Sequence, residues 1–238
     1  MDREAFLDRI AERLGRPRQH RAPAAPARGV PVPELRAPLA GGLVASFVRE
    51  LEAVGGKALV VSDLAELERE LGAELERFGA RRIVTWARSE LEGFGLSWLF
   101  ERLGARAVGE GELADAATLR DVLLASDVGV TRVDFAVAAT GSVVLTPGPT
   151  RPRAVSLLPS LHVALVREAE LVPRMGAALG AFATRPNAEL PSLVQFITGP
   201  SRTSDIENDL TIGVHGPAAV LAVILLSDAA AARTEELA

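Results

Sequence analysis

Helical and strand-like hydrophobic patterns alternate along residues 43–124, and this alternation most constrains the fold. Apolar residues at helical spacing occupy 43–54, 64–78, 96–103 and 116–124, and short aliphatic runs occupy 57–61, 82–86 and 105–108. Ser62 or Asp63 caps the second helix, with Glu66 placed to complete a capping box from Asp63. Strands joined by crossover helices pair in parallel and need cover on both faces. The sequence therefore predicts an α/β domain with a largely parallel sheet.

The pattern becomes richer in strands after Asp127. Two β-rich runs, 128–139 and 142–146, meet at Thr140-Gly141, which predicts a hairpin or a tight reversal inside the sheet. Further along we expect a short helix at 154–158, a strand at 162–166, a helix at 171–182 that Pro173 interrupts early, and strands at 193–197, 210–214 and 220–226. The domain is therefore expected to span 40–228, followed by a helical or frayed tail at 229–238.

Residues 1–39 have a different character. Phe6, Ile10 and Leu14 recur every four residues, which predicts a short amphipathic helix over residues 3–14. Six prolines and several arginines follow between Arg16 and Pro38 without an apolar period, as in a linker or extended arm. Two interpretations remain open, a disordered spacer and an arm that docks its helix on another subunit.

Composition excludes several classes of function. A net charge of −5 gives no electrostatic case for binding nucleic acid or an anionic membrane. The chain has no cysteine, so it cannot form disulfides, use a thiol nucleophile or hold an iron–sulfur cluster by thiolates. The start of the chain lacks a signal-peptide pattern. The longest aliphatic run in the whole sequence, 218–226, is about half the length of a membrane span. We expect a cytoplasmic protein.

A polar loop follows the predicted strand at 193–197. Ligands of open α/β sheets bind beyond the carboxyl ends of strands, and this loop supplies hydroxyls, a guanidinium fork and a glycine that admits backbone N–H groups to an anion. The expected ligand-binding residues here are Thr198, Gly199, Ser201, Arg202 and Thr203, with Ser204 beside them. The alternative is a turn in which Ser201 or Thr203 caps a short helix, with Asp205 and Glu207 in its first turn.

The turn between the two β-rich runs is a second candidate site. Thr140 and Ser142 offer hydroxyls on either side of the flexible Gly141. Because glycine and small polar residues dominate turns in general, a plain turn remains the alternative.

The three histidines differ in context. His215 lies in Gly-Val-His-Gly-Pro and suits acid–base work or carboxylate binding, or else a structural bond to nearby backbone. His162 begins an apolar strand and is expected to be a hydrogen-bonded core histidine, while His20 lies in the proline-rich arm and is expected to be solvated. Their spacing predicts no metal site. Neither a dinucleotide or phosphate-binding glycine motif nor a serine-hydrolase elbow is present.

Four motifs carry a resemblance to a known family. They are Ala-Val-Ala-Ala-Thr-Gly-Ser-Val-Val-Leu at 136–145, Ser-Leu-Leu-Pro-Ser-Leu-His-Val-Ala-Leu at 156–165, Ile-Thr-Gly-Pro-Ser-Arg-Thr-Ser-Asp-Ile-Glu at 197–207, and Gly-Val-His-Gly-Pro at 213–217. In order and spacing over about 40–228 the chain resembles the LUD domain family, and within it the lactate utilization protein C group. The resemblance implies a three-layer α/β/α fold similar to the ribose-phosphate isomerase and coenzyme A transferase group.

The same resemblance implies a part in oxidising L-lactate to pyruvate beside two partners, one of which carries iron–sulfur clusters. On this interpretation the chain is an accessory subunit with no cofactor of its own, binding a small carboxylate or phosphate. The alternative is a stand-alone isomerase or transferase acting on a phosphorylated sugar or an acyl coenzyme A, with Glu207 or Asp205 as nucleophile or base. Members of the family commonly carry an acidic residue where this chain has Ala139. If that carboxylate is catalytic, this chain lacks the activity; if it is structural, little changes.

Overall fold

The computed structural model describes residues 2–15, 39, 41–109, 113, 115–184, 191–203, 211–213 and 215–227. The chain divides into two compact units, Met1–Pro38 and Leu39–Ala238. Helix α1 (Arg3–Arg13) in the first unit confirms the amphipathic helix predicted there. Residues 16–38, with His20, and the tail at 229–238 lie outside the described residues.

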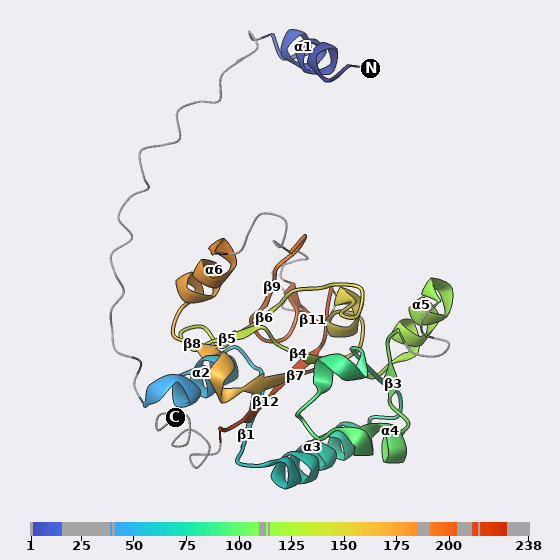
Figure 1. Ribbon diagram of the computed structural model, residues 1–238, viewed down its shortest axis with the longest axis vertical. Helices are drawn as coiled ribbons and strands as arrows, with labels where there is room; N and C mark the ends of the chain where they lie inside the picture. Colours follow the sequence, from blue (N-terminus) through green and yellow to red (C-terminus); the bar gives the residue numbers. More distant parts are fainter. Residues whose placement is uncertain are drawn as a thin grey trace, which may run out of the picture. The chain divides into compact units, whose positions relative to one another are not determined.

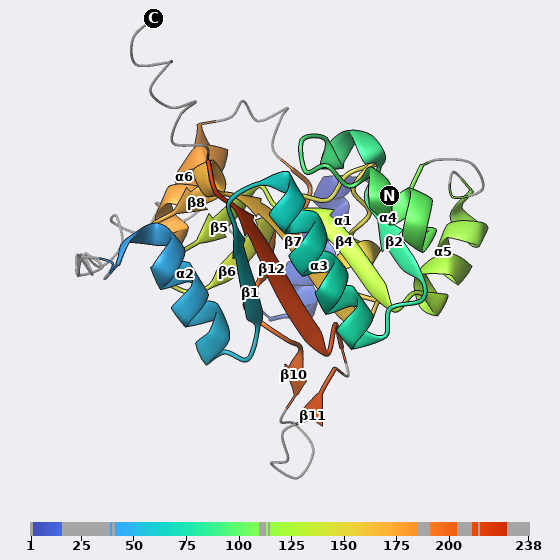
Figure 2. The same cartoon turned by 90° about the horizontal axis from the view of Figure 1, so that it is seen from below.

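A six-stranded parallel sheet forms the centre of the second unit (Figures 1 and 2). In spatial order its strands are β1 (Lys57–Val61), β12 (Ala219–Leu225), β7 (Leu161–Arg167), β4 (Val128–Arg132), β2 (Ile83–Thr85) and β3 (Arg106–Ala107). Each neighbouring pair runs parallel. The interior residues of β7 and β12 are buried, as expected for strands covered on both faces. The predicted α/β fold with a largely parallel sheet is confirmed.

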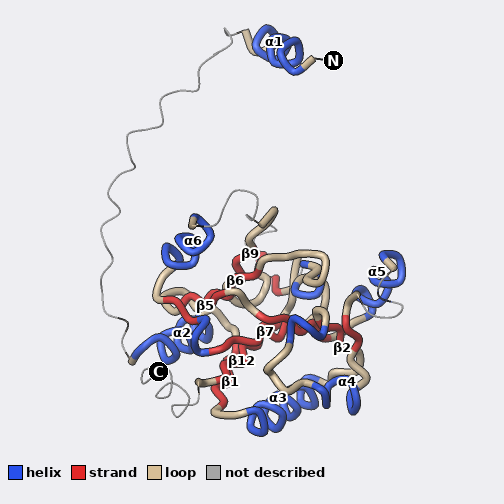
Figure 3. Tube along the Cα trace, viewed as in Figure 1, coloured by secondary structure: helices blue, strands red, loops and turns tan. Residues whose placement is uncertain are grey.

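Helices lie around this sheet and around a second, smaller sheet, on which α6 (Met175–Ala183) packs, as the coloured trace makes clear (Figure 3). They are α2 (Gly42–Ala53), α3 (Leu64–Phe78), α4 (Ser97–Leu103), α5 (Ala116–Ala125) and α6, with the short 3₁₀ helices η1 (Arg88–Leu91), η3 (Arg153–Ser156) and η4 (Glu168–Glu170). None of the described helices is long and apolar enough to cross a membrane.

Helix α3 illustrates how local sequence produces this packing. Leu67, Leu71 and Leu75 fall on one helical face, and all three are buried. Asp63 caps the helix by accepting a hydrogen bond from the Glu66 backbone N–H at 2.8 Å. The Glu66 carboxylate reaches back to the backbone N–H of Ser62, also at 2.8 Å, one residue before the expected partner.

A second, four-stranded sheet lies on the side of the main sheet opposite α3 and α4 (Figure 1). Its order is β8 (Leu171–Val172), β5 (Phe135–Val137), β6 (Ser142–Leu145) and β9 (Gln195–Ile197). The hairpin predicted at Thr140-Gly141 is confirmed as β5 and β6, but it belongs to this sheet rather than to the main one. The long run predicted at 128–139 therefore breaks after Arg132, where the chain leaves one sheet for the other.

Other predicted boundaries also change for reasons of pairing. The helix expected from residue 171 starts at Met175, because residues 171–172 pair with β5 as strand β8 and Pro173 follows them. The strands expected at 193–197 and 210–214 are shorter, as β9 and as β11 (Thr211–Ile212). Among the described strands, β11 pairs with β10 (Arg202–Thr203) in a small antiparallel ribbon.

Candidate functional site

A cleft of about 460 Å³ lies beside β9 and the loop that follows it. One part of its lining comes from η3 and Leu157, and another from Leu193 and residues 195–201 and 215–217. Its polar lining residues are Arg153, Ser156, Gln195, Thr198, Ser201 and His215. The volume falls within the range of small-molecule sites, roughly 300–1,000 Å³. The cleft therefore contains three of the five residues predicted in the 198–203 loop, Thr198, Gly199 and Ser201.

The two stretches predicted separately as binding loops meet beside this cleft. Strand β6 pairs with β9 in antiparallel fashion, which brings Ser142 next to Thr198. Their hydroxyl oxygens are 2.7 Å apart, and the Thr140 hydroxyl is 2.8 Å from that of Ser142. Ser142 is fully buried, and it connects the exposed Thr140 with the exposed Thr198 of the cleft lining.

The glycines of both loops accommodate the C-terminal end of α2. Gly141 has φ +60°, and a Cβ there would lie 2.2 Å from the Leu51 backbone nitrogen. Gly199 has φ +78°, and a Cβ there would lie 2.9 Å from the carbonyl oxygen of Val54. We predicted flexibility for ligand approach at these positions, whereas the structure reveals close backbone packing.

Arg202 lies at the same helix end. Its Nη2 donates a 2.5 Å hydrogen bond to the carbonyl oxygen of Val54, the C-cap residue of α2. A cation in this position satisfies a terminal carbonyl and interacts favourably with the helix dipole. Arg202 and Thr203 belong to β10 and lie outside the residues that line the cleft. Ser204, Asp205 and Glu207, on which the helix-cap and nucleophile hypotheses rest, fall outside the described residues.

At least one backbone N–H group of the 198–203 loop already donates a hydrogen bond within the protein. The Ser201 N–H donates to the Pro217 carbonyl at 2.9 Å, and the Gly213 N–H donates to the Ser201 carbonyl at 2.9 Å. These bonds tie the 198–203 loop to the segment that carries His215. His215 is exposed and lines the cleft, where it can meet a ligand.

His162 is buried in the core, as predicted, but only half of its hydrogen-bonding capacity is used. Its Nε2 lies 2.9 Å from the Thr131 hydroxyl oxygen, while Nδ1 has no partner among the described residues. Burial lowers the pKa of His162 to about 3, so the imidazole is neutral at physiological pH. The core position predicted for His162 is confirmed, but the prediction that its imidazole is hydrogen-bonded holds for Nε2 and not for Nδ1.

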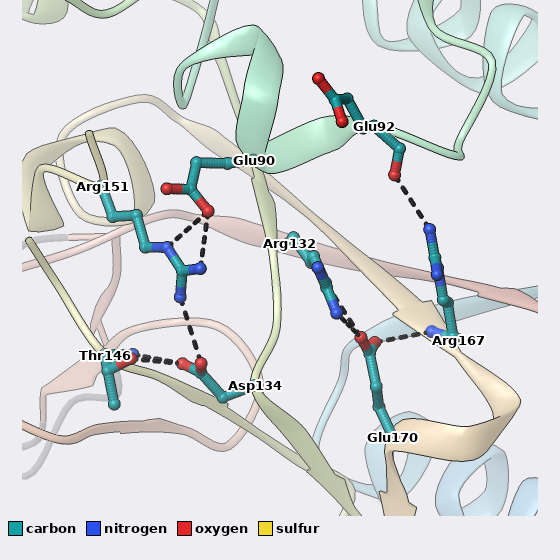
Figure 4. Close-up of polar contacts among 8 residues, drawn as sticks. All are labelled: Glu90, Glu92, Arg132, Asp134, Thr146, Arg151, Arg167 and Glu170. Carbon is teal, nitrogen blue, oxygen red and sulfur yellow. Dashed lines mark hydrogen bonds and ion pairs between the residues drawn. The ribbon is translucent and has the colours of Figure 1, made fainter.

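Sequence reasoning missed a network of charged residues at the carboxyl ends of the main-sheet strands (Figure 4). Arg151 contacts one Glu90 oxygen through Nε at 2.7 Å and Nη2 at 2.6 Å, and Asp134 through Nη1 at 3.2 Å. The other Asp134 oxygen accepts hydrogen bonds from the Thr146 N–H at 2.6 Å and hydroxyl at 2.8 Å. Partial burial raises the pKa of Glu90, but hydrogen bonds from Arg151 and Thr150 outweigh it and keep that pKa below its usual value.

Glu170 organises a second part of the network in Figure 4. It accepts hydrogen bonds from Arg132 Nε and Nη2 at 2.9 and 2.7 Å, and from the Arg167 backbone N–H at 2.8 Å. Arg167 Nη2 in turn donates to the Glu92 carbonyl at 2.9 Å. Arg132 and Arg167 are the last residues of β4 and β7, so the network joins strand ends to the connections that follow them.

The position of this network has a topological meaning. Strands β2 and β4 are neighbours in the main sheet. The next main-sheet strand after β2 is β3 on one side, whereas the next after β4 is β7 on the other side, so the direction in which strands are added reverses between β2 and β4. Ligand crevices of open α/β sheets form at such switch points. The available signal is Arg132-Val-Asp134 at the end of an apolar run, a segment that the sequence pattern predicts as part of the longer strand 128–139. Among the described residues, no cluster of three or more histidines and carboxylates could hold a metal ion.

Comparison with known proteins agrees with this architecture. The lactate utilization protein C of Halalkalibacterium halodurans is 31% identical over 218 residues, covering 90% of this chain and 94% of that protein. The proteins of the same name from Exiguobacterium sp. and Bacillus subtilis are 32% and 31% identical, covering 94% and 95% of this chain and 96% and 97% of theirs.

A solved structure is similar in fold. The crystal structure of a DUF162 family protein from Deinococcus radiodurans matches with a TM-score of 0.57 at 21% identity, covering 78% of this chain and 96% of that one. The family model of the LUD domain matches residues 44–225, which span most of the α/β unit. The chain therefore belongs to the LUD domain family.

Proposed function

We propose that this chain is a subunit of the lactate utilization protein C type, which takes part in oxidising L-lactate to pyruvate without a redox centre of its own. The observation that carries the proposal is its similarity to proteins of that name over more than nine-tenths of their length. Oxidation of lactate releases two electrons, and a chain without cysteine has no thiolates to hold an iron–sulfur cluster. The electron acceptor, an iron–sulfur protein, is then a partner.

In this proposal the cleft binds a small carboxylate. Arg153 and His215 offer polar N–H groups at its lining, and Thr198 and Ser201 offer hydroxyls. No acidic residue is found among the described residues that line it. A stand-alone isomerase or transferase would need such a residue as nucleophile or base, so the described cleft does not favour that alternative.

Deletion of the gene in the native host tests the function. We expect the deletion strain to lose growth on L-lactate as sole carbon source while it grows normally on pyruvate. Tagged protein purified anaerobically from the complemented strain should bring down iron-containing partners, whereas the chain made alone should be colourless and should not oxidise lactate. Normal growth of the deletion strain on L-lactate, or lactate oxidation by the chain alone, would overturn the proposal.

The loop arginine gives a sharper test of where the carboxylate binds. If the guanidinium of Arg202 contributes a charge-assisted contact, Arg202→Ala should weaken binding of L-lactate or pyruvate by roughly 10- to 100-fold with the fold intact. Arg153→Ala is the comparison variant, because Arg153 lines the cleft itself and its loss should weaken carboxylate binding directly. Both variants are measured by calorimetry. If only Arg153→Ala weakens binding, Arg202 does not contact the carboxylate, and its role is to cap the C-terminal end of α2.

Helix α1 is expected to serve association. Phe6, Ile10 and Leu14 are 47%, 40% and 56% exposed, so their apolar stripe lacks cover in the described unit. Deleting residues 1–38 should leave the melting temperature nearly unchanged but abolish self-association or partner capture. Replacing the three apolar residues with serine should have the same effect, and Arg9→Ala on the same helix should not. A large fall in melting temperature with association intact would contradict this role.

A further inference from the structure

The part of the cleft lining that comes from η3 is held in place by contacts with the rest of the domain. Residues 153–156 form a single 3₁₀ turn, and such short helices depend on outside contacts for stability. Within the cleft, Gln195 Nε2 donates a 3.2 Å hydrogen bond to the Ser156 hydroxyl. The fully buried Val155 packs the turn against Gly129 of β4, and the chain that enters the turn provides a further attachment.

That entering segment, 150–152, is fastened to the end of β2. The Ala87 N–H donates to the Thr150 carbonyl at 3.2 Å, and Trp86 Nε1 donates to the Pro152 carbonyl at 3.2 Å. The Thr150 hydroxyl donates to Glu90 at 2.6 Å. Contacts on both sides of Arg151 therefore place its guanidinium over the switch point of the main sheet.

Arg151 completes this attachment with its charged group. It bridges Glu90 in η1 and Asp134 in the β4–β5 connection (Figure 4). Its guanidinium carbon also lies 5.6 Å from the centre of the Trp86 ring. Its side chain is 29% exposed and those of its carboxylate partners 17% and 16%, so solvent screens these pairs less than it screens surface ones. Asp134 is itself held by Thr146, which makes the anchor rigid.

We propose that Arg151 is a positioning residue for the cleft, holding the η3 part of its lining at the distance from the 195–201 part that ligand binding requires. This role rests on the proposed use of the cleft as a carboxylate site. The positioning itself does not depend on which ligand binds. Arg132 offers a matched comparison, because it also makes two hydrogen bonds to one carboxylate at the same sheet edge, but its partner Glu170 lies outside the 150–157 segment.

The absence of cysteine allows a direct measurement. A spin label on Arg153→Cys reports the nanosecond mobility of η3 by its paramagnetic resonance line shape. We expect Arg151→Gln to shift this spectrum to narrower, more mobile lines and Arg132→Gln to leave it unchanged. Arg151→Lys should restore it only in part, because an ammonium cannot reproduce a planar fork between two carboxylates. An unchanged spectrum in Arg151→Gln, or equal changes in both glutamine variants, would overturn the proposal.

Glu90→Gln keeps the test decisive if Arg151→Gln fails to fold, since it removes one anchor charge while retaining a side-chain oxygen for Thr150. It should mobilise the label, and an immobile label would count against the positioning role. Calorimetry with L-lactate should find weaker binding to unlabelled Arg151→Gln than to Arg132→Gln. If the deletion strain grows normally on lactate while the label still becomes mobile, the proposed function fails and the positioning role stands.

Discussion

Alanine at Gly141 is expected to cost roughly 2–5 kcal/mol of unfolding free energy, the sum of about 1–3 kcal/mol for overpacking and about 1–2 kcal/mol for the left-handed backbone. The new Cβ would lie 2.2 Å from the Leu51 nitrogen and 2.5 Å from its Cα. These are backbone atoms of α2, so no side-chain rotation can relieve the overlap. Because Leu51 is itself buried, the helix must move or the hairpin must open.

Gly104→Ala separates the two terms. Gly104 has φ +61°, almost the same as the +60° of Gly141, but a Cβ there meets nothing within 4 Å. It should cost only the left-handed term, about 1–2 kcal/mol. Urea unfolding of both variants, compared at equal m-values, gives the difference. Equal losses would show that α2 yields easily at the hairpin.

Acid is expected to destabilise the domain through His162 well before its carboxylates titrate. The imidazole has a pKa of about 3 when folded, against 6.5 for an ordinary histidine. Between these values the unfolded chain binds a proton that the folded chain excludes. His162 thus contributes stability that is fully present above pH 6.5 and is lost as the pH falls towards 3. The slope approaches about 1.4 kcal/mol per pH unit below the ordinary pKa.

The double variant Thr131→Val/His162→Leu tests this. It removes both partners of the 2.9 Å hydrogen bond, so neither is left buried and unpaired, and stability at pH 7.5 should change little. Unfolding free energies between pH 5.0 and 6.5 should fall less steeply than in the wild type. Thr131→Val alone removes the hydrogen bond but keeps the histidine, so it should retain the wild-type slope. A double variant with that same slope would assign the acid sensitivity elsewhere.

Local sequence determined the class of fold and the main elements of the sheet. The leucines of α3 repeat at helical spacing, and Asp63 begins that helix with its own side chain. Helical period, capping and aliphatic runs all act over a few residues, so they can be read before any tertiary contact is known. The family motifs also identified the hairpin and the 198–203 loop as special.

Only the tertiary structure decided what these special residues contact. The Ser142 and Thr198 hydroxyls come together across 56 residues, and Arg202 reaches Val54 across 148. Arg151 bridges Glu90, which precedes it by 61 residues, and Asp134, which precedes it by 17. This bridge exists because the chain leaves the main sheet for the second sheet after Arg132. Such contacts depend on which strands pair and where the order reverses, and neither leaves a periodic signal in the sequence. The sequence could therefore identify Thr198 and Gly141 as candidates, while only the tertiary structure placed Gly141 against α2 and Arg151 beside the cleft.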